Sequence, residues 1–153
     1  MEESAEMRIL HYLLGMPPVR KGGLVKYVID LAVAQSKSND VVILYPGSLS
    51  RKQEDRANVR IRKKGKKFDI RLFVIHNSLP IPMGNGIQEA DKFMLKCNKS
   101  IYLSFLQEVK PDVIQMHSLM GIHVEFLIAA NELNIPIVYT THDYYGLCPT
   151  INM

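Results

Sequence analysis

Residues 135–149 read I-P-I-V-Y-T-T-H-D-Y-Y-G-L-C-P. After the proline, the run from Ile137 to Thr141 is mostly β-branched and aromatic, which is typical of a strand. His142 and Asp143 follow it directly, where a turn is expected. Open α/β sheets bind their ligands outside the carboxyl ends of their strands. The stretch therefore predicts a strand that ends at a binding edge.

Upstream of this stretch, strand-like and helix-like segments alternate. Near-continuous apolar runs predict strands buried on both faces at residues 7–14, 41–45 and 113–116. Apolar residues at helical spacing predict helices from Gly23 to about residue 35, over 89–109, and over 119–133 with Ser118 as the N-cap. Strands alternating with helices predict a parallel sheet covered on both faces.

Residues 58–76 interrupt this alternation. Apolar and charged residues alternate on both sides of the run Lys63-Lys64-Gly65-Lys66-Lys67, which predicts a hairpin around a basic turn. The following residues 77–88 contain two prolines and two glycines and are predicted to be a loop. We expect residues 1–153 to form one Rossmann-like, three-layer α/β domain, with a mostly parallel sheet ordered around the first strand.

Composition narrows the class of protein. The 153 residues are 47% hydrophobic and 22% charged, as in globular proteins, and the net charge of +4 is too small to predict nucleic-acid binding. The acidic N-terminus does not read as a secretory signal, and no apolar run is long enough to cross a bilayer. Cys97 and Cys148 form no C-x-x-C pattern and predict a reduced protein. These features predict a cytoplasmic location.

Three loops after strands carry the candidate site residues. Gly22 and Gly23 precede a helix, where backbone N–H groups could face a phosphate, or they form only a tight turn. His117 and His142 each follow a strand at the expected edge and could converge as hydrogen-bonding or acid/base groups, or be unrelated strand-end residues. Asp143 could orient a hydroxyl group or cap a turn, and Tyr144 could stack on a sugar or cover the core.

Other chemistry is less well supported. His11 lies within the first strand and is interpreted as structural. No histidine has a companion at metal-ligand spacing, so no metal or cofactor is predicted. The dinucleotide and P-loop glycine motifs are absent.

Three of these segments together resemble the N-terminal domain of GT-B glycosyltransferases, specifically the retaining family 4 group. The resemblance rests on M-R-I-L-H-Y with G-G-L-V-K-Y-V-I-D-L-A, on K-P-D-V-I-Q-M-H-S, and on P-I-V-Y-T-T-H-D-Y-Y-G-L-C-P. It implies that Gly22 and Gly23 approach the donor diphosphate or the acceptor, and that His117 and the loop 77–88 line the acceptor pocket. It further implies that His142 lies beside the transferred sugar.

Taking the residues and the resemblance together, we expect catalytic roles for His142 and Asp143 and substrate contacts from Gly22, Gly23, His117, Thr141 and Tyr144. The expected partners of the chain are a nucleotide-sugar donor and a saccharide or lipid-linked acceptor. A lipid-linked acceptor would imply a peripheral contact with the inner face of the membrane.

The chain departs from the family in one respect. The glutamate pair of the E-x7-E pattern is absent, since no two glutamates are eight positions apart. We therefore expect the acceptor-side half of a transferase, without its C-terminal donor domain and inactive alone. The alternative is a non-catalytic assembly module that pairs with a separate partner domain. A receiver-like domain fits less well, because no acidic cluster follows the first strand.

Overall fold

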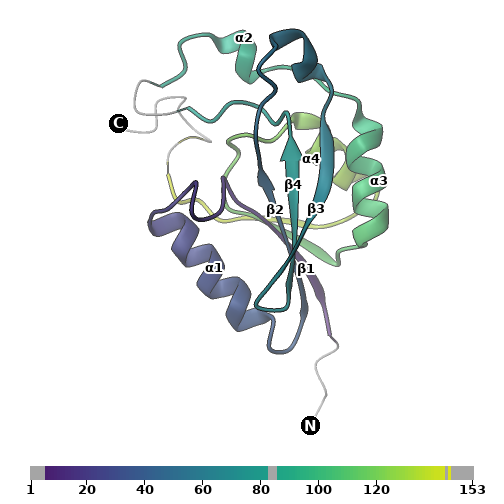
Figure 1. Cartoon of the computed structure of the whole chain (residues 1–153). Coiled ribbons are helices and arrows are strands. Elements are labelled where there is room, and N and C mark those ends of the chain that lie inside the picture. Colours follow the sequence, from purple (N-terminus) through teal and green to yellow (C-terminus); the bar gives the residue numbers. More distant parts are fainter. Residues whose placement is uncertain (1–5, 83–85, 144, 146–153) are drawn as a thin grey trace.

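Six strands form one sheet in the order β3-β4-β2-β1-β5-β6, with β1 near the centre as predicted (Figure 1). The computed structural model describes residues 6–82, 86–143 and 145. The strands are β1 (Arg8–Tyr12), β2 (Asp40–Pro46), β3 (Arg60–Lys67), β4 (Ile70–His76), β5 (Val113–Met116) and β6 (Ile137–Tyr139). All neighbouring pairs are parallel except β3 and β4. The predicted mostly parallel α/β fold is confirmed.

Helices cover both faces of this sheet. Helix α1 (Gly23–Gln35) packs on one face through Val25, Val28 and Ala32. Helices α3 (Lys99–Val109) and α4 (Val124–Glu132) pack on the other face, opposite α1 (Figure 1). Two short helices lie in the connections: η1 (Gln53–Ala57) between β2 and β3, and α2 (Ala90–Phe93) between β4 and α3.

The strands at the centre are apolar because both of their faces are covered. Leu10 and Tyr12 of β1 belong to the core under α3 and α4, whereas Val41 and Ile43 of β2 belong to the core under α1. Each such side chain stabilises the folded state by about 1.5–3 kcal/mol when it is fully removed from water. The near-continuous apolar runs in the sequence therefore correspond to these central strands.

The predicted hairpin is present, but its turn was misplaced. The basic residues 63–67 continue strand β3, and the two-residue turn is Phe68-Asp69, since Lys67 pairs with Ile70. Both turn residues have positive φ (53° and 60°), the conformation that a type I′ hairpin turn requires. The lysines suggested a loop because they are polar, but on an edge strand of this kind polar side chains face solvent.

The predicted helix over residues 89–109 is also wrong. It is divided into α2 and α3, and residues 94–98 between them are not helical. Asn98 begins α3 because its side-chain Oδ1 accepts a hydrogen bond from the backbone N–H of Ser100. The apolar spacing that joined Met94 and Cys97 to Ile101 therefore does not describe a continuous face.

The last helix begins later than predicted. It starts at Val124 with His123 at the N-cap position, and residues 119–123 form an irregular connection. The Ser118 hydroxyl instead accepts a hydrogen bond from the backbone N–H of Met120, which stabilises a turn. This connection follows β5 and is one of the loops at the carboxyl edge of the sheet.

Candidate functional site

The carboxyl ends of the parallel strands meet at one edge of the sheet and border a cleft. This cleft has a volume of about 500 Å³ and is lined by residues 15–20 after β1, 45–49 at the end of β2, and 78–81 after β4. Lys64 of the edge strand also lines it. The volume lies within the range of small-molecule sites, and residues 78–81 of the predicted loop 77–88 border it.

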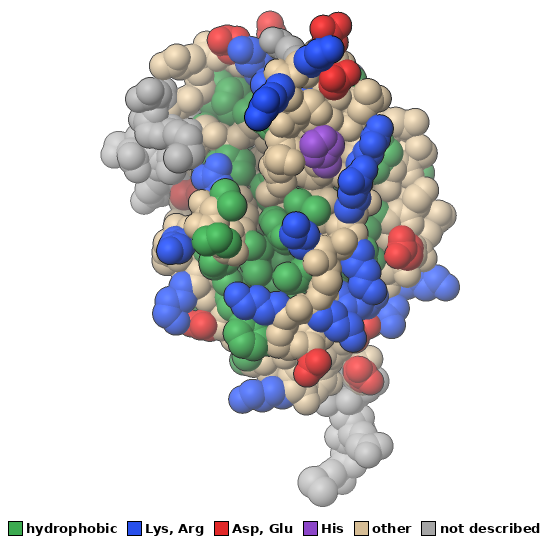
Figure 2. Space-filling view, in the orientation of Figure 1, with side chains coloured by type: hydrophobic (Ala, Val, Ile, Leu, Met, Phe, Trp, Pro, Cys, Tyr) green, Lys and Arg blue, Asp and Glu red, His purple; other side chains and the backbone are tan. Residues whose placement is uncertain are grey.

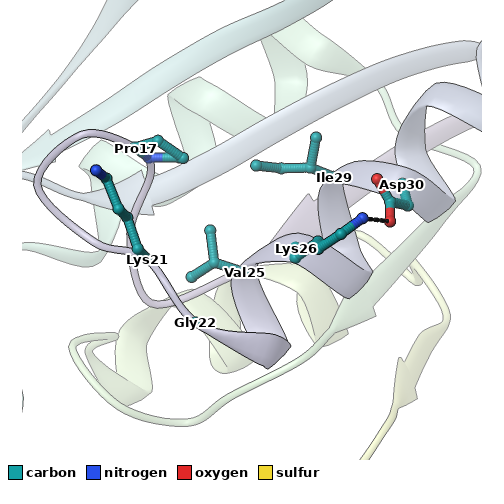
Figure 3. A pocket seen from close by; sticks show the side chains of 7 residues that line it. All are labelled: Pro17, Lys21, Gly22, Val25, Lys26, Ile29 and Asp30. Atoms are coloured by element: carbon teal, nitrogen blue, oxygen red, sulfur yellow. Dashed lines mark hydrogen bonds and ion pairs between the residues drawn. The ribbon is translucent and has the colours of Figure 1, made fainter.

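Beside this cleft, Gly22 and Gly23 form the start of α1. Gly22 is the N-cap residue with φ 140°, a conformation that side chains disfavour, and a Cβ on either glycine would meet no atom within 4 Å. The helix start therefore leaves room for a ligand to approach its backbone. Figure 3 shows the adjoining hollow, with Val25 and Ile29 facing it and the Lys26–Asp30 ion pair at one side. The volume of this hollow is about 530 Å³.

His117 and His142 come together at this edge, as the sequence predicted. Nδ1 of His117 lies 3.2 Å from Nε2 of His142, and their ring centroids are 5.5 Å apart. His117 is buried at the end of β5, whereas His142 is exposed after β6. The pairing follows from parallel strands, because β5 and β6 are neighbours and both histidines follow their carboxyl ends.

His11 extends this pair inward, which the sequence interpretation missed. Nδ1 of His11 lies 3.0 Å from Nε2 of His117, and Nε2 of His11 lies 2.6 Å from Oε1 of Gln35 at the end of α1. We call Gln35, His11, His117 and His142 the histidine row. Strand register could have found it, since His11 pairs with Gln115 and residue 117 is on the same face of β5.

The surroundings keep the inner rings of this row neutral. Burial lowers the pKa of His11 from its ordinary value, with the Gln35 hydrogen bond opposing the change. Burial first, then the neighbouring His11 and His142, lower the pKa of His117 to about 4. The ring centroid of Tyr27 on α1 lies 5.1 Å from that of His142 and 6.1 Å from that of His117, in edge-to-face arrangements. These contacts locate the outer rings beside the first turns of this helix.

The remaining predicted site residues have different environments. Asp143 accepts a hydrogen bond from the backbone N–H of Tyr145 at 3.0 Å, so one of its oxygens caps a turn. Thr141 is exposed between β6 and His142. Tyr144 lies outside the described residues.

Two further histidines lie outside the row. Nδ1 of His123 shares a hydrogen bond with the hydroxyl of Tyr102 at 2.8 Å. The ring nitrogens of His76 contact the hydroxyls of Ser48 and Ser50. Across residues 6–82, 86–143 and 145, no three His, Cys, Asp or Glu side chains are arranged to hold a metal ion. In the histidine row the nitrogens bond to one another and do not converge on one point.

Comparison with known proteins gives the site its context. Residues 21–150 match the model of the family described as Glycosyltransferase Family 4. The solved structures include a similar chain, the catalytic domain of starch synthase IV from Arabidopsis thaliana bound to ADP and acarbose, with 20% identity and a TM-score of 0.49. The similarity covers 92% of this chain and 34% of the length of that domain. No curated protein matches the chain. Because the family model spans most of the sequence, the chain belongs to glycosyltransferase family 4.

Proposed function

We propose that this chain forms the acceptor side of an active site that transfers a sugar from a nucleotide-sugar donor to a saccharide or lipid-linked acceptor. The observation that carries the proposal is the His117–His142 pair at the carboxyl edge, beside the open start of α1, in a chain of family 4. An exposed imidazole held by a buried one is suited to bind sugar hydroxyl groups or to exchange protons with them.

The start of α1 would complement this pair. The first N–H groups of a helix have no partner within the helix, and the backbone N–H of Lys26 is the donor to the carbonyl of Gly22. The N–H groups before Lys26 are thus available to an anionic group, such as a donor diphosphate, which the helix dipole also favours. No acidic side chain occupies the first turn of α1 to compete with it.

Transfer itself would need a second domain. Catalysis of this kind depends on holding donor and acceptor together and on stabilising the departing diphosphate. The cleft of this chain opens to solvent, and the sequence carries no E-x7-E pair that would hold the donor. We therefore infer that the 153-residue chain binds ligands weakly and does not turn over alone.

The test combines binding and turnover. The purified chain is titrated with free monosaccharides and with UDP, GDP and ADP while amide NMR signals are recorded, and release of sugar from labelled nucleotide sugars is measured in parallel. We expect shifts confined to residues around Gly22, Gly23, His117 and His142, without turnover. Robust transfer by the chain alone would refute its assignment as one side of a site, and absence of ligand-dependent shifts would favour the assembly module.

A lipid-linked acceptor would bring the chain to a membrane surface. In the part of the chain that the structure describes, no helix is long and apolar enough to span a bilayer. Edge strand β3 instead presents six exposed cations: Arg60, Arg62, Lys63, Lys64, Lys66 and Lys67. Figure 2 shows Lys and Arg side chains gathered along the side of the molecule where β3 lies.

We propose that the exposed cations of β3 form the membrane-facing surface. Each Lys or Arg near an anionic bilayer contributes about 1 kcal/mol of attraction. The chain should therefore sediment with vesicles containing phosphatidylglycerol and remain in solution with pure phosphatidylcholine. Substituting Lys66→Glu and Lys67→Glu together should abolish sedimentation, whereas Lys37→Glu, an exposed lysine outside β3, should lower it only slightly. Equal losses from both variants would exclude β3 as a specific surface.

A further inference from the structure

The histidine row obeys a simple constraint. A neutral imidazole has one N–H donor and one bare nitrogen that accepts. Each imidazole–imidazole link of the row joins two nitrogens, at 3.0 Å between His11 and His117 and at 3.2 Å between His117 and His142. One hydrogen must occupy each link, so the rings have to adopt the same tautomer in sequence. When all three rings are neutral, the row therefore has two states, in which the hydrogen bonds run in opposite directions. The group at the inner end of the row selects between them.

The inner end is the side-chain amide of Gln35. Its Oε1 lies 2.6 Å from Nε2 of His11, and its Nε2 donates to Oε1 of Gln115 at 3.4 Å. Gln115 is the register partner of His11 on β5, so both lie on the same face of the sheet as the row. A carbonyl oxygen can only accept, so in this orientation Nε2 of His11 carries the hydrogen.

The remaining positions follow from this one. Nδ1 of His11 is bare and accepts from Nε2 of His117. Nδ1 of His117 is then bare and accepts from Nε2 of His142. Consequently Nδ1 of His142, which bonds to no residue in the described part of the chain, carries a lone pair toward solvent.

We propose that Gln35 and His11 are positioning residues that fix the tautomer of His142, so that its outer Nδ1 accepts a hydrogen bond from a sugar hydroxyl group. The choice of a sugar hydroxyl rests on the proposed function; the direction of the row does not. A neutral His142 in this tautomer has no N–H to offer a phosphate oxygen. The diphosphate would instead be bound elsewhere, for example by the backbone at the start of α1.

The row also determines which imidazole ring can hold an added proton. If a hydroxyl group passes its proton to Nδ1 of His142, that ring becomes an imidazolium and still donates through Nε2 to His117. Every link of the row therefore stays intact. The pKa of about 4 at His117 keeps the added proton from moving inward near neutral pH. The row thus orients His142 and does not conduct protons into the core.

The tautomers can be read directly by NMR. Two-bond ¹H–¹⁵N spectra of the full chain, labelled at histidine, distinguish an N–H nitrogen from a bare one. We expect His11, His117 and His142 all to carry hydrogen on Nε2 near neutral pH. A bare Nε2 in any of the three would overturn the proposal, whatever the ligand.

Variants of Gln35 separate a positioning role from a structural one. Gln35→Glu keeps an acceptor oxygen and should retain the wild-type tautomers. Gln35→Met has a similar length but no acceptor, and should shift His142 partly to the Nδ1–H form. His123 and His76, which are bonded to Tyr102 and to serines, should be unchanged in both variants and serve as internal controls. Unchanged tautomers at His142 in Gln35→Met would refute control by Gln35.

Ligand titration tests the second part of the proposal. Glucose, galactose, mannose or N-acetylglucosamine should shift the ¹⁵N signal of His142 Nδ1 as it accepts a hydrogen bond, and UDP should leave that signal in place. A response to UDP with none to the sugars would overturn the hydroxyl assignment. Nε2–H tautomers throughout, with no response to any of these ligands, would retain the positioning role and count against both the hydroxyl assignment and the proposed function.

Discussion

The two ends of the sheet satisfy their polar side chains in opposite ways. At the amino end, Asp40 bonds to Arg8 at 2.5 Å and to Arg71 at 2.8 Å, and Asp112 accepts from the backbone N–H of Arg8. Asp40 is thus paired with two arginines, and Asp112 with a backbone N–H group. At the carboxyl end, the histidine row is bonded inward, and His142 keeps one ring nitrogen without a partner among the described residues. An ionic network fixes structure, whereas an open-ended row leaves an atom for a ligand.

The contrast between the two ends of the sheet is tested most strongly by substituting His142. In an enzyme reconstituted from this chain and a donor-side domain, His142→Ala should lower kcat by about 10²–10³, the usual cost of losing one preorganised hydrogen-bonding group. The side chain is exposed, so the free energy of unfolding should change little. Steady-state kinetics and urea unfolding of the same preparation provide the measurement. Full turnover in the variant would remove His142 from the site.

The second prediction concerns pH and the buried part of the row. The ordinary pKa of histidine is 6.5, and in the folded chain burial and neighbouring rings lower the pKa of His117 to about 4. As pH falls below 6.5, the unfolded chain binds a proton that the folded chain does not. The free energy of unfolding contributed by the neutral ring is therefore fully present above pH 6.5 and is lost progressively down to about pH 4. The loss approaches about 1.4 kcal/mol per pH unit for each proton taken up.

Urea unfolding between neutral pH and pH 5 measures this loss. The variant His117→Gln removes one of the protons, so its stability should fall less steeply with decreasing pH than that of the wild type. His11 and His123, whose pKa values are also lowered by burial, still contribute in the variant. Equal slopes for the two proteins would show that His117 protonates as easily in the folded chain as in the unfolded one.

The same contrast explains what the sequence could reveal. Apolar runs and helical spacing depend on burial, which repeats along the chain, and so the central strands, α1 and the edge at which His117 and His142 meet were predictable. The break in the helix prediction at Asn98 and the turn at Phe68-Asp69 depend on single side-chain or backbone conformations that apolar spacing does not register.

The contact between His11 and His117 was not predicted, for a different reason. Its position inside an apolar strand predicted a structural role, and it is indeed buried. Its contact with His117 depends on the register between β1 and β5, which are far apart in sequence and separated by the hairpin and α3. Local patterns do not specify such a pairing, so the site was predicted at its exposed end and missed at its buried end.

The smallest effect is expected at the amino end of the sheet. Asp40→Ala leaves Arg8 and Arg71 close together without the carboxylate that bridges them. Because the Asp40 side chain is 29% exposed, water partly compensates, and we expect a loss of about 1–2 kcal/mol in the free energy of unfolding. Urea unfolding measures this loss. Turnover of the reconstituted enzyme should not change, because the substitution lies at the opposite end of the strands from His142.

A matched control for this substitution is available on α1. Lys26 and Asp30 form an isolated i,i+4 ion pair whose side chains are 77% and 62% exposed, so Lys26→Ala should cost no more than about 0.5 kcal/mol. A larger loss for Asp40→Ala than for Lys26→Ala would show that one carboxylate between two arginines acts as a network. If Asp40→Ala instead lowered kcat while leaving the urea midpoint unchanged, the assignment of a structural end and a ligand-binding end to this sheet would be wrong.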